Sequence, residues 1–333
     1  MPPPAWIEAH YSNGFYPVWD AHLRSVTDRV PFSIGDVFFV GLFLLLVGVW
    51  IACLRGAKAE QRLRASANSL LGTCVVLAGV FIAFMASWAY NYHRVPVKQK
   101  MALHPERVNN TSIAALADRT VRMLNANVSG AHAERFTDAQ MQRLLEPTFY
   151  ATTRRLGDRV SFPPTPVKPT IFEPLMRASA TYGFTDPWTH EINLSTSLSA
   201  IERPAAYAHE WSHLSGFADE SEANFIAAIS CIASKDPALR YSGWMLIWFN
   251  LPSDAHVRNR ALPAVIADVN AIVARFRRQT KPAVERVQRA VYGRYLQANN
   301  VGAGFESYRL FVQLITAGEF DRDGLPIVKR LRK

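Results

Sequence analysis

The sequence predicts a transmembrane helical hairpin followed by a mainly α-helical, α+β domain. Two uncharged apolar runs predict the hairpin: residues 37–54, about 18 residues, and residues 69–90, about 22 residues, each long enough to cross a bilayer as a helix. After Pro96 the composition becomes that of a soluble domain, in which apolar residues recur at helical spacing. A proline-rich stretch over 162–166 interrupts this pattern and predicts a break between helices.

The loop between the two apolar runs predicts the orientation of the hairpin. Residues 55–64 carry four basic side chains and one acidic one, and positively charged loops stay in the cytoplasm. With this turn inside, the hairpin over 37–92 places both the segment 1–36 and the domain 93–333 outside the cytoplasm. The opposite orientation stays open, because residues 94–100 also contain three basic side chains close to the second run.

Aromatic residues lie at the ends of the two apolar runs. Trp50 is near one end of the first run, and Trp88, Tyr90 and Tyr92 cluster at the end of the second. Indole and phenol rings favour the headgroup zone of a bilayer, so this placement favours two membrane spans. The alternative is a pair of helices buried in a protein core.

The formal net charge of +10 bears on the expected partners. No helix-turn-helix, zinc-finger or RNA-binding signature accompanies the basic residues, so we expect no nucleic-acid partner. A basic protein of the cell envelope that faces anionic lipid or cell-wall polymer is the preferred interpretation. The three cysteines are too few and too widely spaced for a disulfide framework or a cysteine-based metal site.

The strongest chemical signal is the motif His209-Glu210-Trp211-Ser212-His213. On a helix, positions i and i+4 lie on one face, so both imidazoles can bind a single zinc ion. Glu210 is offset by one residue, which keeps its carboxylate beside the ion as a general base for a bound water. This is the HExxH pattern of zinc metalloproteases. The alternative is an amphipathic helix with two polar histidines.

A short strand is expected upstream of this motif. The run Glu191-Ile192-Asn193-Leu194 alternates polar and apolar residues, as a half-buried strand does, and a turn over 186–188 precedes it. An exposed strand edge beside a metal-binding helix can pair with an extended substrate backbone. We therefore expect these four residues to form a substrate-binding edge strand. An ordinary edge strand packed beside the helix is the alternative.

Helical periodicity predicts the rest of the domain. Asp138 is the expected cap of one of these helices, and Gly216 is expected to end the helix of the motif. The apolar run over 242–251 is too short to span a bilayer and is expected to form core. The expected helices cover 113–124, 141–156, 222–229, 262–276, 282–296 and 306–317.

Several segments resemble one bacterial family. They are Pro31-Phe32-Ser33-Ile34-Gly35-Asp36, Trp88-Ala89-Tyr90-Asn91-Tyr92-His93-Arg94, Tyr182-Gly183-Phe184-Thr185-Asp186-Pro187-Trp188-Thr189, the motif region 209–225, and Gly304-Phe305-Glu306-Ser307-Tyr308. In these the chain resembles the membrane proteins called domain-of-unknown-function 3810, which are placed among the gluzincin-type metallopeptidases. The resemblance implies a zincin-like fold for the domain and peptidase chemistry in a bacterial inner membrane, with no substrate class attached.

Three carboxylates just beyond the motif compete to be the third zinc ligand. Asp219 would complete a HExxHxxGxxD pattern, but it is also a natural N-cap for the next helix. Glu220 fits the gluzincin arrangement, in which a residue four positions later, here Asn224, supports a ligating histidine. Glu222 has only Ile226 at that position. We expect Glu220 to bind zinc and Glu222 to serve packing or the outer shell of the site.

These observations favour a membrane-anchored zinc metallopeptidase that hydrolyses peptides or proteins of the cell envelope. Glu210 would act as general base, and the resemblance suggests Tyr308 as the donor that faces the developing oxyanion. The alternative is a catalytically inactive membrane scaffold of the same fold with a structural or empty metal site. A third interpretation, a basic nucleic-acid-binding protein, requires the domain to lie in the cytoplasm.

Overall fold

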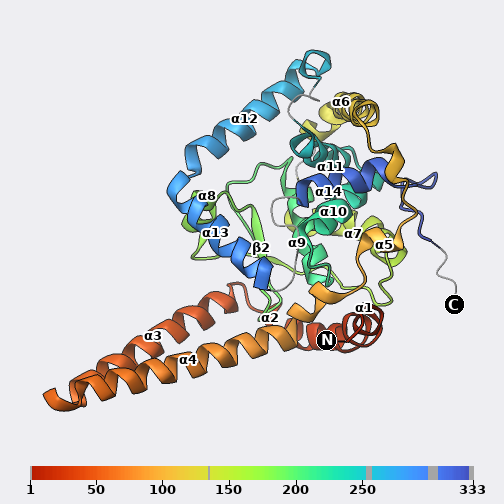
Figure 1. Cartoon of the computed structure of the whole chain (residues 1–333). Helices are drawn as coiled ribbons and strands as arrows, with labels where there is room; N and C mark the ends of the chain where they lie inside the picture. Colours follow the sequence, from red (N-terminus) through yellow and green to blue (C-terminus); the bar gives the residue numbers. More distant parts are fainter. Residues whose placement is uncertain (1, 134–135, 253–256, 299–306, 330–333) are drawn as a thin grey trace.

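The computed structural model describes residues 2–133, 136–252, 257–298 and 307–329, with the backbone alone described at 292, 295–298 and 307–309. Two long helices, α3 (Ile34–Gly56) and α4 (Arg62–Ser87), form an antiparallel arm that projects from a helix-rich domain (Figure 1). The tip of the arm is the short helix η2 (Ala59–Gln61). This architecture confirms the predicted helical hairpin and the mainly helical domain with a small sheet.

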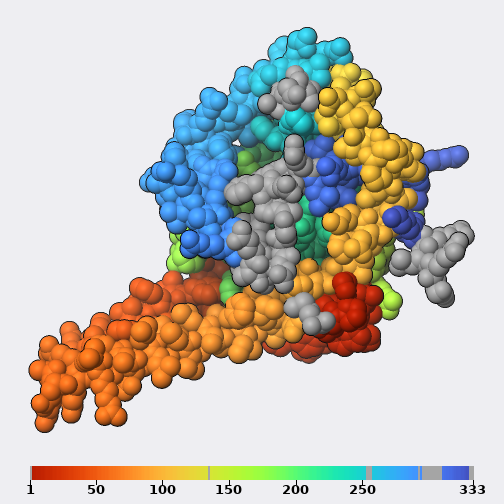
Figure 2. Space-filling view, viewed as in Figure 1, coloured from red at the N-terminus to blue at the C-terminus, as the bar shows by residue number. Residues whose placement is uncertain are grey.

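Both helices of the arm are long and apolar enough to cross a membrane. The domain covers none of the most apolar 18-residue window of α3 and only 11% of that of α4, so the two helices are not core helices. They stand clear of the domain over most of their length (Figure 2). Trp50 links them, since its Nε1 donates a hydrogen bond of 2.9 Å to Oγ1 of Thr73.

The chain before the arm is helical and lies against the domain. It consists of α1 (Pro4–Trp6), the π-helix η1 (Ile7–Phe15) and α2 (Tyr16–Thr27). Tyr16 is fully buried, and it packs with Phe84 and Trp88 from the end of α4 and with Phe162 and Ala218 from the domain. This small apolar cluster joins the N-terminal segment, the arm and the domain.

The core of the domain surrounds α10 (Glu220–Ala233), most of whose side chains are buried. Ring stacking adds to the core, since Phe149 and Trp211 lie parallel with centroids 3.9 Å apart. Each helix predicted by periodicity overlaps an observed one, although residues 156 and 262 lie just outside their helices and residue 306 lies outside the described residues. The helices that pack on α10 are α7 (Asp138–Arg155), α9 (Arg203–Leu214), α11 (Pro237–Asn250) and α14 (Ser307–Ala317), and α6 (Asn110–Ala133) packs on α11.

One predicted cap is wrong. Thr137, not Asp138, caps α7, because Thr137 and Gln140 form a reciprocal capping box. Asp138 is the first residue of the helix, and its carboxylate pairs with the guanidinium of Arg203 at 2.7 Å. The threonine lies one residue earlier in the chain, where its hydroxyl reaches the free backbone N–H of the first turn.

Peripheral helices complete the domain. Two of them, α12 (Pro263–Gln279) and α13 (Pro282–Ala298), run along one side of it (Figure 1). The remaining short elements are η3 (Ala89–His93), α5 (Val97–Lys100), η4 (Pro105–Arg107), α8 (Glu173–Ser179) and η6 (Arg258–Arg260).

The sheet has three short strands in the order β1-β3-β2. β1 (Val167–Lys168) is parallel to β3 (Ile192–Leu194), and β2 (Gly183–Thr185) is antiparallel to it, with Phe184 opposite Asn193. The prediction that residues 191–194 form an edge strand is therefore wrong, because β3 is the central strand and all three of its residues are buried. Among the described residues β2 pairs only with β3, and it lies beside α9.

Candidate metal centre

Two imidazoles and one carboxylate converge where α9 meets α10. Nε2 of His209 lies 3.1 Å from Nε2 of His213 and 3.1 Å from Oε2 of Glu220, and Nε2 of His213 lies 3.7 Å from Oε1 of Glu220. The three ligand atoms lie within 4.8 Å of one another. Ligands about 2.0–2.2 Å from a tetrahedral zinc ion are ~3.3 Å apart, so this donor set fits zinc.

The turn between the two helices brings these residues together. Gly216, with φ of +81°, donates its N–H to the carbonyl of His213, and the N–H of Phe217 bonds the carbonyl of Ser212. This is a Schellman motif, which ends α9 at Leu214, one residue after His213. Asp219 then caps α10 by accepting hydrogen bonds from two backbone N–H groups. Glu220 is thereby fixed as the first residue of α10, facing back toward α9.

Each histidine is oriented through its other ring nitrogen. Nδ1 of His209 lies 3.0 Å from Oδ1 of Asn224, and Nδ1 of His213 lies 2.8 Å from the carbonyl oxygen of Phe217. Since both partners are acceptors, Nδ1 carries the proton in each neutral ring and the lone pair is on Nε2. Both lone pairs therefore point into the space that Glu220 also faces. Asn224 occupies the supporting position expected from its spacing to Glu220.

The charges of the cluster also suit a cation. Burial lowers the pKa of His213, but the carboxylate of Glu220 outweighs burial and raises that pKa to about 9. Burial likewise raises the pKa of Glu220, but the neighbouring His213 and His209 bring it well below the usual range of a glutamate. Glu220 is therefore an anion between two imidazoles, and a divalent cation can take the place of the proton that this carboxylate favours on His213.

Glu210 lies beside this trio and is held by β2. Its carboxylate accepts a hydrogen bond of 3.0 Å from Oγ1 of Thr185, whose hydroxyl also lies 2.7 Å from the backbone carbonyl of Glu210. A Cβ atom at Gly183 would lie 2.8 Å from Oε1 of Glu210, so only glycine lets the strand come this close. Burial raises the pKa of Glu210, and His209 and His213 partly offset this. A raised pKa suits a group that takes up a proton near neutral pH.

Glu222 and Asp219 point away from the trio. Oε1 of Glu222 accepts a hydrogen bond of 2.6 Å from the N–H of Val97 at the start of α5, so this side chain packs α10 against α5. Burial, with Asp219 as a lesser cause, raises the pKa of Glu222 to about 7. The carboxylate of Asp219 is occupied by capping α10. Of the three carboxylates considered from the sequence, Glu220 alone faces both histidines.

The predicted substrate-binding role of residues 191–194 is wrong for a second reason. Glu191 is fully buried and accepts hydrogen bonds from the N–H groups of Ile34 and Gly35, at 3.1 and 2.9 Å, at the start of α3. The same two carboxylate oxygens also accept hydrogen bonds from the ammonium of Lys168 and from the hydroxyl of Thr189. Glu191 thus stabilises the N-terminus of the first apolar helix. Ile192, Asn193 and Leu194 are likewise buried in the sheet.

Tyr308 belongs to α14, but its side chain lies outside the described residues. Its role as an oxyanion donor stays a prediction.

Residues that the sequence did not assign to the site hold the turn between α9 and α10 from outside. Nε1 of Trp88, just past α4, donates to the carbonyl of His213 at 3.2 Å, and the hydroxyl of Tyr16 donates to the carbonyl of Leu214 at 2.7 Å. Arg94 donates to the carbonyl of Gly216 at 3.2 Å and stacks over the ring of Phe217. Nothing in the sequence pointed to this role: Trp88 was noted as an aromatic residue at the end of the second apolar run, and Trp88 and Arg94 as part of one segment of the family resemblance.

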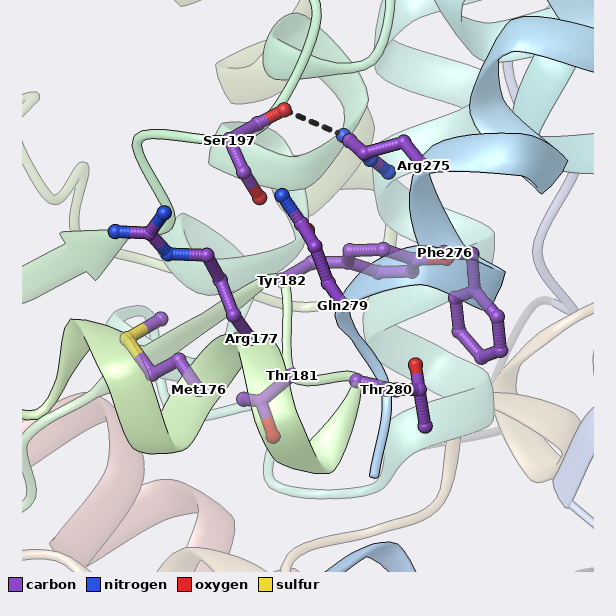
Figure 3. A pocket seen from close by; sticks show the side chains of 10 residues that line it. Met176, Arg177, Thr181, Tyr182, Ser197, Arg275, Phe276, Gln279 and Thr280 are labelled. Atoms are coloured by element: carbon purple, nitrogen blue, oxygen red, sulfur yellow. Dashed lines mark hydrogen bonds between the residues drawn. The ribbon is translucent and has the colours of Figure 1, made fainter. Parts of the chain in front are cut away.

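A pocket lies at the other end of β2, between α8 and α12 (Figure 3). Tyr182, the residue before β2, lines it together with Arg177 and Arg275. Arg275 donates to the carbonyl of Ser197 at 2.8 Å and pairs with Glu202 at 2.6 Å.

The chain belongs to the family described as protein of unknown function (DUF3810), whose model matches residues 11–316. No curated protein and no solved structure matches the chain. Family membership thus covers both the arm and the candidate metal centre, and it assigns no activity to either.

Proposed function

We propose that this protein is a membrane-anchored zinc metallopeptidase. The observation that carries the proposal is the convergence of His209, His213 and Glu220 at zinc-ligand distances, with the buried Glu210 on the same helix as the histidines and within range of the charges of all three. A structural zinc site needs four protein ligands and no base, whereas three ligands with an adjacent carboxylate leave a position for water. The three described ligands and the buried carboxylate therefore favour hydrolysis over a purely structural site.

The protein residues have distinct roles in this proposal. Zinc, when bound, polarises the scissile carbonyl and acidifies a water molecule. Glu210 takes the proton of that water and later delivers it to the leaving amine. Thr185 holds the carboxylate in place through its hydrogen bond. Asn224 and the carbonyl of Phe217 keep the two imidazoles in the orientation that zinc needs.

The edge of β2 that faces away from β3 has no strand partner among the described residues, and in this proposal it takes the role first assigned to residues 191–194. It lies beside α9, and its Gly183 and Thr185 approach Glu210. An extended peptide that pairs with this edge would pass the metal centre with its backbone fixed. The substrate class is accordingly a peptide or protein in the cell envelope.

We propose that α3 and α4 span the bacterial inner membrane, in contact with its lipid, and that the domain lies outside the cytoplasm.

The test combines metal analysis of the purified full chain with a peptide-library cleavage assay. The native protein should contain about one zinc per chain and cleave peptides, while Glu210→Gln should keep zinc and lose hydrolysis, because the amide keeps the shape and removes the base. Glu106→Gln, which changes a solvent-exposed carboxylate in η4, is the matched control and should behave as native. Zinc without cleavage in the native protein would favour the inactive scaffold.

A further inference from the structure

The metal centre lies directly against the end of the second apolar helix. Nε1 of Trp88, one residue after α4, donates to the carbonyl of the ligand residue His213. The hydroxyl of Ser87 donates to the carbonyl of Pro187 at 3.0 Å, and Nε1 of Trp188 donates to the carbonyl of Val80 at 3.2 Å, inside α4. The domain therefore has no spacer between its candidate active site and the arm.

The lengths of the apolar runs locate the membrane surface relative to these contacts. Residues 37–54 of α3 span ~27 Å as a helix, close to the ~30 Å of a bilayer's hydrocarbon core. In α4 the domain begins to cover the helix at Phe84. Trp188 packs on Phe39 and Phe84 with ring centroids 4.9 and 5.4 Å away, a position typical of an interfacial tryptophan. The bilayer surface on the domain side thus lies near the level of Val37 and Ser87.

β2 leads from that surface past the metal centre. Thr185 contacts the Glu210 carboxylate, and Pro187, two residues later, contacts Ser87 at the end of α4. Two residues of extended chain cover ~7 Å. At its other end β2 begins beside Tyr182 and the pocket between α8 and α12 (Figure 3). A peptide paired with the edge of β2 that faces away from β3 would therefore run between the membrane surface and this pocket.

The geometry points to a substrate class: polypeptide segments that emerge from the membrane and are cut within about six residues of its surface, a distance of ~20 Å in extended conformation. This inference rests on the proposed peptidase function and on α3 and α4 spanning the bilayer. A substrate held in the same membrane also gains in effective concentration over a free peptide, which favours its cleavage.

The experiment uses the full chain reconstituted in lipid vesicles. The probe is a single membrane-spanning Leu-rich helix followed by a randomised 20-residue tail on the side of the domain, and mass spectrometry reads the cleavage positions. We expect cuts within the first six or so tail residues to exceed those beyond the twelfth by roughly tenfold. Cuts only beyond the twelfth residue would overturn the inference and leave the peptidase function standing. The same random tail without the membrane helix controls for sequence preference.

A second measurement does not depend on hydrolysis. In the Glu210→Gln protein, a photoreactive residue at the fourth position of the same tail should crosslink to residues 183–188, and one at the sixteenth position should do so at least several-fold less. Crosslinks of equal yield from both positions would contradict the inference. If neither the tethered nor the free tail is cleaved by the native protein, the proposed function fails, and the crosslinking pattern still decides whether the site lies at the membrane surface.

Discussion

At the residue scale, three neighbouring carboxylates have three different tasks. Glu220 faces both imidazoles, Asp219 caps α10, and Glu222 binds the backbone of α5. These tasks follow from their positions around the first turn of one helix, because successive residues of a helix point in directions about 100° apart. The difference between them can be measured through zinc affinity and stability.

Glu220→Ala should weaken zinc binding by far more than the 10–100-fold typical of an outer partner, because it removes a ligand. Asp219→Ala should leave zinc affinity within about tenfold and lower the free energy of unfolding by about 1 kcal/mol through loss of the cap. Competition with a chromophoric chelator measures the affinities. Normal zinc binding by Glu220→Ala together with its loss in Asp219→Ala would show that the ligand is misassigned.

The hydrogen bond between Asn224 and His209 should also affect zinc affinity. Asn224→Leu should reduce zinc affinity about 10–100-fold, because His209 loses the acceptor that fixes its ring. Asn224→Asp keeps an acceptor oxygen at the same place and should restore most of the affinity. Equal affinities for the native protein and Asn224→Leu would mean that the hydrogen bond does not orient the ligand.

At the element scale, the turn between α9 and α10 depends on an arginine distant in sequence. Arg94 bonds the carbonyl of Gly216, pairs with the buried Asp158 at 3.0 Å and with Glu8 at 3.3 Å, and stacks on Phe217. It therefore links the N-terminal segment, the chain after α7 and the turn between the two helices that carry the candidate ligands.

Arg94→Met should lower the free energy of unfolding by about 3–5 kcal/mol, since it leaves the carboxylate of Asp158 buried without its cation. Arg260→Met is the matched control: Arg260 pairs with Asp118 on the surface, and its loss should cost at most ~1 kcal/mol. Urea unfolding of the two variants in detergent provides the comparison. A similar, small loss in both would argue against a bracing role for Arg94.

Within single helices the sequence predicted the candidate site, whereas contacts between distant segments could not be predicted. The ligands, the cap and Asn224 lie within sixteen residues of one another, so helical spacing alone relates them. Glu191 was misinterpreted because its partners Ile34 and Gly35 are about 157 residues away in the chain. Alternation of polar and apolar residues predicts a half-buried strand, but here the polar side chains face a buried polar network instead of water.

At the scale of the whole molecule, the arm and the domain form one unit. The apolar runs and the helical periodicity predicted both parts, since each depends on local composition. How they join could not be predicted, because the contacts come from single residues of the N-terminal segment, α4 and the loop after β2. These contacts place the candidate metal centre at the base of the arm.

The proposed topology gives a whole-molecule prediction. A reporter that is active only outside the cytoplasm should work when fused after Lys333 and fail when fused near Lys58, because the basic loop between the spans stays inside. A cytoplasmic reporter at the same two positions serves as the control and should give the opposite pattern. Activity of the external reporter at Lys58 alone would reverse the orientation of the domain.

The proposed activity depends on zinc held by two histidines and one glutamate. X-ray absorption at the zinc edge, measured on the purified full chain together with its metal content, tests it most directly. We predict about one zinc per chain, bound by two imidazole nitrogens and by oxygen ligands at about 2.0–2.2 Å, with one imidazole signal lost in His213→Ala. A folded chain without zinc, or a spectrum without two imidazole ligands, would contradict the account.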